Sequence, residues 1–353
     1  VGSVASIVLA VSLMLAVLTG GGFRPSASTD DRPGQEETGV IEAQPMSLVT
    51  GASSSPPGPI PSNFDLGQYL DSGWGMPESY AYGPEGNFRM ICDFSHLAYD
   101  DPIVYPGEVG RSHLHMFFGN TLADANSTYE SLRTTGDGTC QGGPINRSAY
   151  WTPAMFNASG QVIIPEFISV YYKGVSRNAA DIISMDAIPD GLKMIAGYNM
   201  ADPAADTHFD WYCERNQVKR QTLPQCAGGE RVGGVLAFPY CWDGVNLDSP
   251  DHRSHLAYAQ NHQCPSSHPV RIPEYTIGVW YNHDGDSQNW YLASDRMPGM
   301  THPNGSSFHA DWMGAWDPEI QDRWITNCVN GLLNCAGGQL GDGTHLTCLL
   351  YTS

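Results

Sequence analysis

The segment Val162-Ile163-Ile164-Pro165-Glu166-Phe167-Ile168-Ser169-Val170-Tyr171-Tyr172 decides the fold prediction for this chain. β-branched and aromatic residues dominate it, and such residues are enriched in β-strands. Segments of similar composition recur along the chain and end near glycine, proline or other turn residues. The strands that we expect are residues 88–93, 113–118, 162–172, 192–197, 235–240 and 276–281.

Glycine and proline divide the rest of the sequence into short pieces. There are 39 glycines and 25 prolines, and long amphipathic helical patterns are scarce. One helix is expected over residues 318–330, because Pro318 suits a first helical turn and Asp317 can cap it. The predicted fold class is therefore mainly β, an antiparallel β-sandwich with long irregular loops and a few short helices, stabilised by disulfides.

Composition and charge limit the possible partners. The 353 residues are 41% hydrophobic, which is ample for a buried core. Lysine and arginine number 17 against 37 aspartates and glutamates, giving a formal net charge of −20. Duplex DNA and anionic membrane surfaces would repel such a chain. We expect no nucleic-acid partner.

The first part of the chain has the composition of an export segment followed by a tether. Residues 1–18 carry no charge and small residues follow, so we expect residues 1–22 to be a signal peptide or, alternatively, an N-terminal anchor. Residues 23–62 are poor in large apolar residues and are predicted to be a disordered linker. A single globular domain is expected over residues 63–353. Both interpretations place that domain outside the cytoplasm, secreted or at the cell surface, with membrane contact only if the apolar segment is retained.

The nine cysteines all lie in the predicted globular domain. None forms the C-x-x-C spacing that is typical of structural zinc or thioredoxin chemistry, so disulfides are expected. Spacing alone does not fix the connectivity. The local pairing that we expect joins Cys92 with Cys140, Cys213 with Cys226, Cys241 with Cys264 and Cys328 with Cys335, which leaves Cys348 over.

Three segments far apart in the sequence carry paired histidine or acidic residues. In a strand, residues two apart project from the same face, so His113 would lie beside His115. His309 and Asp311 have the same spacing, while Asp251 and His255 belong to a segment that suits a tight turn or one helical turn. The candidate catalytic residues are His113, His115, Asp251, His255, His309 and Asp311, and the candidate metal ligands are His113, His115, His255 and His309.

Two kinds of chemistry fit these residue types. Imidazoles and carboxylates bind zinc, copper or other divalent ions, and a metal could activate water for hydrolysis. Without a metal, the same groups supply an acid and a base for glycosidic cleavage or for β-elimination from uronic acids. The competing interpretation is structural: the histidines would bond to backbone and aromatic neighbours and stabilise glycine-rich loops.

Several of these segments resemble a known family. The motifs are Asp101-Pro102-Ile103-Val104, His113-Leu114-His115, Ser148-Ala149-Tyr150-Trp151-Thr152-Pro153, the run from Phe238 to His252, and Phe308-His309-Ala310-Asp311. In this order they are similar to the family called domain of unknown function nineteen-ninety-six, over roughly residues 88–335. The resemblance implies an exported, single-domain protein, because the family is typical of secreted fungal and actinobacterial proteins, some of them attached to cell-wall or carbohydrate-binding modules. It supplies no catalytic residues.

We therefore predict a secreted protein that acts on extracellular polysaccharide or cell-wall glycan. The first hypothesis is a glycoside hydrolase or polysaccharide lyase with a His/Asp-lined cleft, with or without a divalent metal. In it, His115 or His255 acts as acid or base and Asp311 orients or stabilises charge. The alternative is a non-catalytic glycan-binding or cell-envelope protein whose histidines are structural.

Overall fold

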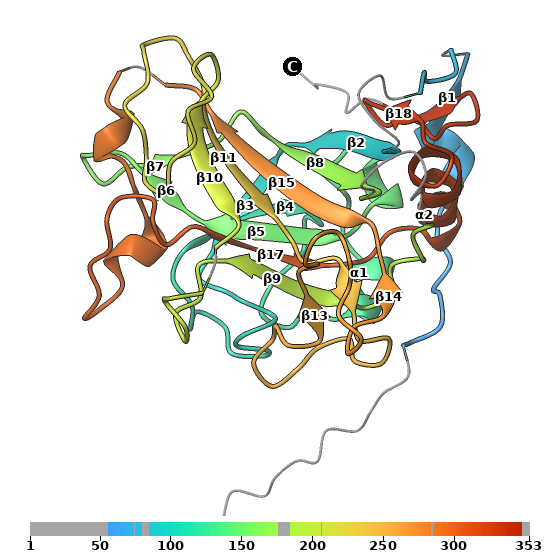
Figure 1. Ribbon diagram of the computed structural model, residues 1–353, viewed down its shortest axis with the longest axis horizontal. Helices are drawn as coiled ribbons and strands as arrows, with labels where there is room; N and C mark the ends of the chain where they lie inside the picture. The colour runs from blue at the N-terminus through green and yellow to red at the C-terminus, as the bar shows by residue number, and fades with distance from the viewer. Residues whose placement is uncertain are drawn as a thin grey trace, which may run out of the picture. The chain divides into compact units, whose positions relative to one another are not determined.

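The computed structural model describes residues 56–73, 75–79, 85–175, 184–205, 207–283 and 285–347 (Figure 1). The predicted signal or anchor segment, most of the predicted linker and Cys348 lie outside these ranges. Within them, no helix combines the length and apolar character needed to cross a bilayer.

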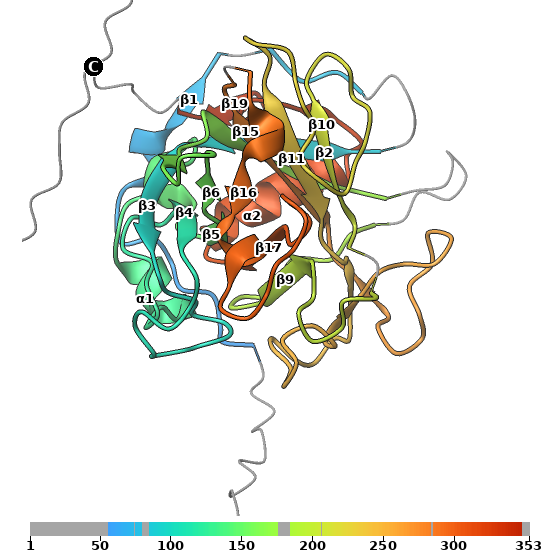
Figure 2. The same ribbon diagram turned by 90° about the vertical axis from the view of Figure 1, so that its left-hand side faces the viewer.

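Two antiparallel sheets face each other across one hydrophobic core (Figures 1 and 2). The six-stranded sheet has the order β10 (Phe209–Cys213), β11 (Val232–Ala237), β15 (Glu274–Tyr281), β8 (Phe167–Lys173), β2 (Asn87–Cys92) and β18 (Asn334–Cys335). The five-stranded sheet has the order β3 (Phe94–Ala98), β4 (His115–Gly119), β5 (Ala149–Pro153), β17 (His309–Met313) and β9 (Lys193–Gly197). Only the pairing of β18 with β2 is parallel within these two sheets as described.

Smaller elements complete the described fold. A two-stranded sheet pairs β1 (Leu70–Ser72) with β19 (Thr344–Leu346). One three-stranded sheet has the order β13 (Leu256–Ala257), β12 (Cys241–Trp242) and β14 (Val270–Arg271). The other has the order β16 (Tyr291–Leu292), β6 (Met155–Phe156) and β7 (Val162–Ile163). The α-helices are α1 (Tyr129–Thr134) and α2 (Pro318–Trp324), and a π-helical turn, Ile325–Val329, continues α2. Four 3₁₀ turns are described: Leu66–Tyr69, Gly143–Ile145, Ser287–Asn289 and Ala293–Arg296.

Alternation along the strands builds the core. In β8, Ile168, Val170 and Tyr172 are buried while the residues between them are half-buried. The hydroxyl of Tyr172 lies 3.0 Å from that of Tyr150 on β5, so a hydrogen bond joins the two sheets across the core. Aromatic and β-branched residues on facing strands thus bury their side chains between the layers, as in a β-sandwich.

The fold class is confirmed, because the protein is mostly β with antiparallel sheets, few short helices and four disulfides. The predicted helix over residues 318–330 is α2 with its π-helical turn, and the Asp317 carboxylate accepts from the backbone N–H groups of Glu319 and Ile320. The predicted strand over residues 162–172 is wrong as one element. It forms β7 and β8, separated by a segment that contains Pro165, whose backbone has no N–H to donate.

All four predicted disulfide pairings are confirmed. Cysteines 92 and 140, 213 and 226, 241 and 264, and 328 and 335 are bonded. Each closes a local loop, of 48 residues at most, so these bonds fasten loops to nearby strands and restrict the unfolded chain.

The C-terminal end of the predicted linker already contacts the domain. The guanidinium of Arg133 on α1 donates to the carbonyl of Ile60 and to the hydroxyl of Ser62. It also lies 3.3 Å from a carboxylate oxygen of Asp317, and both side chains are buried. Residues 60–62 are therefore packed against the folded chain.

The outer face of the five-stranded sheet, which points away from the main core, carries a second hydrophobic cluster. Its members include Phe117, Trp151, Ile195 and Met313. They occupy alternate positions of β4, β5, β9 and β17, and the strand register places Phe117, Trp151, Asp311 and Ile195 in one cross-strand row. Polar residues two positions away on the same strands therefore face the same side.

Candidate metal centre

Three histidines meet on the outer face of the five-stranded sheet. His115 opens β4 and His309 opens β17, while His113 precedes β4. The ring centroids of His113 and His115 are 4.1 Å apart, those of His113 and His309 5.1 Å, and those of His115 and His309 5.9 Å. One ring nitrogen of each lies within 4.8 Å of the others. We call this group the three-histidine cluster.

Backbone carbonyls orient two of these rings. Nδ1 of His115 lies 2.9 Å from the carbonyl oxygen of Asp100, and Nδ1 of His309 lies 2.9 Å from that of Ser307. A carbonyl only accepts, so each Nδ1 carries the proton and each Nε2 keeps a free lone pair. Among the described residues, the buried Nε2 atoms of His113 and His115 have no hydrogen-bond partner. Carbonyls that fix the far nitrogen are a common support of metal-binding histidines.

Burial keeps the cluster uncharged. It lowers the pKa of His115 to about 4 and that of His309 to about 3. The pKa of His113 is also well below its usual value, through burial and through its two histidine neighbours. The three imidazoles are therefore neutral at neutral pH, the state in which histidine binds a metal.

A cavity of about 380 Å³ opens beside the cluster, and we call it the main pocket. His113 and His309 line it, together with Asp101, Asp311 and His252. Asp311 is only 1% exposed, and neither of its carboxylate oxygens has a hydrogen-bond partner among the described residues. Burial, with the nearby charge of Asp101, raises the pKa of Asp311 well above its usual value. Asp311 thus faces the pocket with a carboxyl that favours its protonated form more than an ordinary aspartate does.

Asp101 contributes a second buried carboxyl to this pocket. One of its oxygens accepts from the backbone N–H groups of Ile103, at 3.0 Å, and Val104, at 2.9 Å. Burial raises the pKa of Asp101, and these two hydrogen bonds oppose that rise. The neighbouring Asp100 accepts from the backbone of Gly110 and Ala125. These carboxylates hold the loop that leads from β3 to the cluster.

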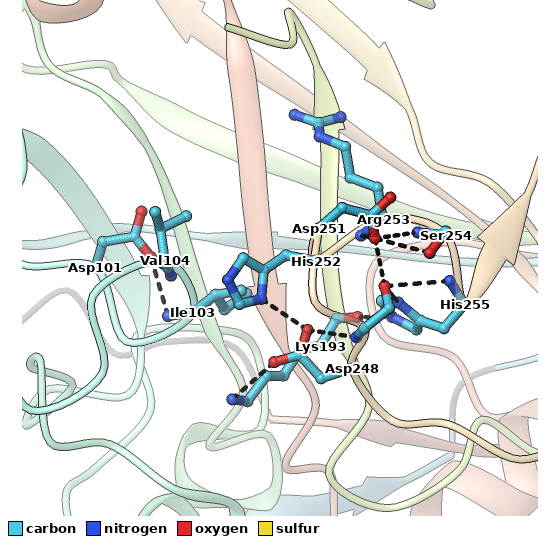
Figure 3. A network of polar contacts seen from close by, with 11 residues as sticks. Asp101, Ile103, Val104, Lys193, Asp248, Asp251, His252, Arg253, Ser254 and His255 are labelled. Atoms are coloured by element: carbon cyan, nitrogen blue, oxygen red, sulfur yellow. Dashed lines mark hydrogen bonds and ion pairs between the residues drawn. The ribbon is translucent and has the colours of Figure 1, made fainter. Parts of the chain in front are cut away.

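A tight turn over residues 248–255 forms another wall (Figure 3). One carboxylate oxygen of Asp251 accepts from the backbone of Arg253, at 3.1 Å, and of Ser254, at 2.9 Å. Burial would raise the pKa of Asp251, but its hydrogen bonds from Ser254 and Ser249 outweigh burial and lower it. The Arg253 guanidinium donates to the carbonyl of Tyr198, at 3.2 Å. Asp251 lines the pocket, and its hydrogen bonds shape the turn.

His255 does not join the cluster. Its Nδ1 lies 2.8 Å from the hydroxyl of Ser249, and its Nε2 donates to the carbonyl of Lys193 at 2.8 Å (Figure 3). Both nitrogens of His255 are therefore engaged, and its side chain does not line the main pocket. The structure brings together His113, His115, His309 and Asp311 from the predicted set, places Asp251 on the wall, and uses His255 to fasten the turn.

The predicted site residues do not include Asp101, His252 and Arg253, which line the main pocket. Asp101 and His252 lie in the motifs that carry the family resemblance, which was the one available signal. These residues lie in loops, and strand periodicity does not predict where loop side chains point.

A second cavity, of about 450 Å³, adjoins the main pocket, and we call it the side pocket. Both cavities are lined by Arg111, Ser112, His113 and Met297. Tyr99 lines the side pocket and is 56% exposed, the only Phe, Trp or Tyr of the described ranges that is exposed and not buried or half-buried. A flat, accessible ring thus stands next to the three-histidine cluster.

The chain belongs to the family described as Domain of unknown function (DUF1996), whose model matches residues 101–316. The predicted resemblance is confirmed, and the matched range contains every residue of the cluster together with Asp101, His252 and Asp311. Neither the curated proteins nor the solved structures contain a match to the chain.

Proposed function

We propose that this member of the DUF1996 family is a secreted, metal-dependent enzyme that cleaves extracellular polysaccharide, as a hydrolase or a lyase, in the main pocket. The observation that carries the proposal is the three-histidine cluster itself. Three neutral imidazoles, with ligand atoms within 4.8 Å of one another, meet beside a cavity open to solvent. Buried polar atoms without partners are rare in folded proteins, and a bound ion would satisfy them.

The donor set favours a catalytic rather than a structural metal. Structural zinc sites are usually closed by four protein ligands, whereas catalytic sites have three and leave a position for water or substrate. Nitrogen donors suit zinc, copper or another late divalent ion. Such an ion would lower the pKa of a bound water and supply a nucleophile or base near neutral pH.

The protein's own groups would do the remaining work. Burial raises the pKa of Asp311, which favours the protonated carboxyl that can donate a hydrogen bond or a proton to substrate. His115 and His309 would hold the metal, since their far nitrogens are fixed by the carbonyls of Asp100 and Ser307. The fixed rings would keep the cluster preorganised.

Two features support polysaccharide as the substrate class. The exposed ring of Tyr99 stands in the side pocket, and aromatic rings offer an apolar face with a polar edge, which suits a sugar ring. Arg111 and Arg296 line the same cavity and supply donors for hydroxyl or carboxylate groups. Four disulfides fit a protein that folds in an oxidising compartment.

The test combines metal content with turnover. Protein from a secretory host is stripped with a chelator, reloaded with zinc, copper or manganese, and incubated with plant, fungal and algal glycans. We expect one ion per chain, with new reducing ends or unsaturated products only in a reloaded form. The His115→Ala variant should lose both, while His262→Asn, at an exposed histidine outside both pockets, should lose neither.

Two outcomes would count against the proposal. A protein that binds no metal, or that binds it equally well without His115, has no catalytic centre of this kind. Glycan binding without turnover in every metal-loaded form would support the alternative, a non-catalytic glycan-binding protein.

A further inference from the structure

His252 lies on the wall of the main pocket, outside the three-histidine cluster. Its Nδ1 is 2.8 Å from Oδ1 of Asp248, and Oδ2 of Asp248 is 3.2 Å from Nζ of Lys193. A carboxylate only accepts, so Nδ1 of His252 carries a proton that is directed at Asp248. Figure 3 shows the imidazole between Asp248 and Asp101, with its other edge turned toward the loop that carries Asp101.

The backbone at His252 is held in an uncommon conformation. Its φ is 57°, in the left-handed region that non-glycine residues rarely occupy. The backbone N–H of His252 donates to the carbonyl of Ser249 at 2.7 Å, and the Asp251 carboxylate fixes the next two residues. Strain of this kind persists where surrounding contacts enforce it and is concentrated at functional sites. Here it places the imidazole on the pocket wall.

The pKa of His252 is shifted in the direction opposite to the pKa values of the cluster histidines. The hydrogen bond that His252 donates to Asp248 raises the pKa of His252, against the effect of burial. The charge of Lys193 lowers that pKa, and the charges of Asp248 and Asp101 raise it. The cluster histidines titrate far below neutrality. His252 is therefore the histidine of the main pocket that is suited to carry and release a proton near neutral pH.

We propose that His252, oriented by Asp248, is the catalytic proton donor of the main pocket. This inference rests on the proposed function and adds the group that protonates the leaving oxygen. As the bond to that oxygen breaks, its electron pair stays on the oxygen, and the proton moves from Nε2 of His252 to it. In hydrolysis, water supplies the hydroxyl that joins the other fragment, and the remaining proton of that water returns to His252.

The test uses a substitution that keeps the turn but removes the titrating group. In His252→Asn, the asparagine tolerates the left-handed backbone, and its amide can still donate to Asp248. The matched control is His262→Asn, because His262 also has a positive φ, 61°, and is exposed outside both pockets. Metal content is measured in every sample, so loss of the cluster is distinguished from loss of the donor.

The probes are two acetate esters, p-nitrophenyl acetate and phenyl acetate, hydrolysed by the zinc-loaded protein. Nitrophenolate is the weaker base and leaves without being protonated, whereas phenolate is the stronger base and depends more on a proton donor. We expect His252→Asn to lower kcat/KM for phenyl acetate by about 100-fold, a typical general-acid contribution, and for p-nitrophenyl acetate by much less. The wild-type rate for phenyl acetate should fall as pH rises through the pKa of His252, and the variant should lack that fall.

A substrate-independent measurement accompanies the kinetics. In the metal-free protein, the ring-nitrogen NMR shifts of His252 should show a midpoint above the ordinary histidine value of about 6.5. The proposal is overturned by a midpoint below that value or by equal losses with the two esters. If the zinc-loaded wild type cleaves neither ester, the NMR midpoint alone decides. If no zinc binds, the proposed function fails first, and the NMR midpoint still decides whether Asp248 holds the proton on His252.

Discussion

Two buried aspartates, sixteen residues apart in the chain, show how scaffold and site differ in this protein. Asp295 is 0% exposed, and four donors serve it: the backbone N–H groups of Leu292, Gly305 and Ser307, and the Ser307 hydroxyl. Asp311 is 1% exposed and has no hydrogen-bond partner among the described residues. The first carboxylate closes a loop, and the second faces the main pocket.

The comparison extends to the histidines. His255 uses both nitrogens on protein groups, whereas His115 uses one and leaves the other without a partner in the described structure. His255 thus holds the fold with both nitrogens, whereas the partnerless nitrogen of His115 is a buried polar atom that a ligand would satisfy. The scaffold also serves the site, because Asp295 binds Ser307, whose carbonyl orients His309.

The largest expected effect separates His115 from His255. His115→Ala removes a proposed metal ligand, so zinc affinity should fall by more than the ten- to hundredfold that loss of an indirect support typically causes. His255→Gln breaks hydrogen bonds of the turn and should lower the free energy of unfolding by about 2 kcal/mol while leaving zinc affinity unchanged. Competition titration with a zinc chelator and urea unfolding measure the two quantities. Equal zinc affinities for both variants would erase the distinction.

Acid should destabilise the metal-free protein through the cluster. His115 and His309 have folded pKa values of about 4 and about 3, below the unfolded value of about 6.5, so the unfolded chain binds more protons as pH falls below 6.5. The contribution of these two histidines to the free energy of unfolding is thus complete above pH 6.5 and is lost toward pH 4 for His115 and pH 3 for His309. At pH 5 the loss is about 2 kcal/mol for each histidine. Urea unfolding at several pH values checks this. A His115→Gln variant with the same pH dependence as the wild type would contradict it.

Replacing Asp295 tests the scaffold half of the comparison. In Asp295→Asn, an amide nitrogen would face N–H or O–H donors that now bond to a carboxylate oxygen. We expect a loss of about 2 kcal/mol in the free energy of unfolding, the cost of hydrogen bonds to a charged group. Thermal and urea unfolding measure it. An unchanged free energy of unfolding in Asp295→Asn would mean that the four hydrogen bonds do not hold the loop.

Replacing Asp311 should have the smallest effect on stability and the opposite sign. Its raised folded pKa means that its contribution to stability is present below the unfolded pKa of about 3.9 and is lost as pH rises through the folded pKa. Asp311→Asn removes this penalty and should stabilise the protein at pH 7 by about 1 kcal/mol, while turnover falls. Destabilisation at pH 7 would show that Asp311 has partners that the structure does not describe.

Sequence reasoning reached those parts of the protein that local pattern determines. Strand composition identified β2 and β15, and the expected pairing of cysteines that are neighbours in the sequence matches all four disulfides. The spacing of His113 and His115 predicted neighbouring rings, although β4 begins only at His115. The spacing of His309 and Asp311 likewise placed both on one face of β17.

The rest depends on contacts between distant segments. His252 and His255 are three residues apart, and only the left-handed backbone at His252 and the reach of His255 to the carbonyl of Lys193 determine which ring faces the pocket. Asp101 enters through a loop whose shape is set by its own hydrogen bonds to Ile103 and Val104. Neither the periodicity nor the composition of the sequence predicts such contacts between distant segments.

The most direct test of the account is anomalous diffraction from crystals of the zinc-loaded protein. We expect one strong peak per chain at the zinc edge, bonded to His113, His115 and His309 at about 2.0–2.1 Å and open to the main pocket. Crystals in which zinc is absent from the cluster, or binds only surface histidines such as His262, would contradict the central claim.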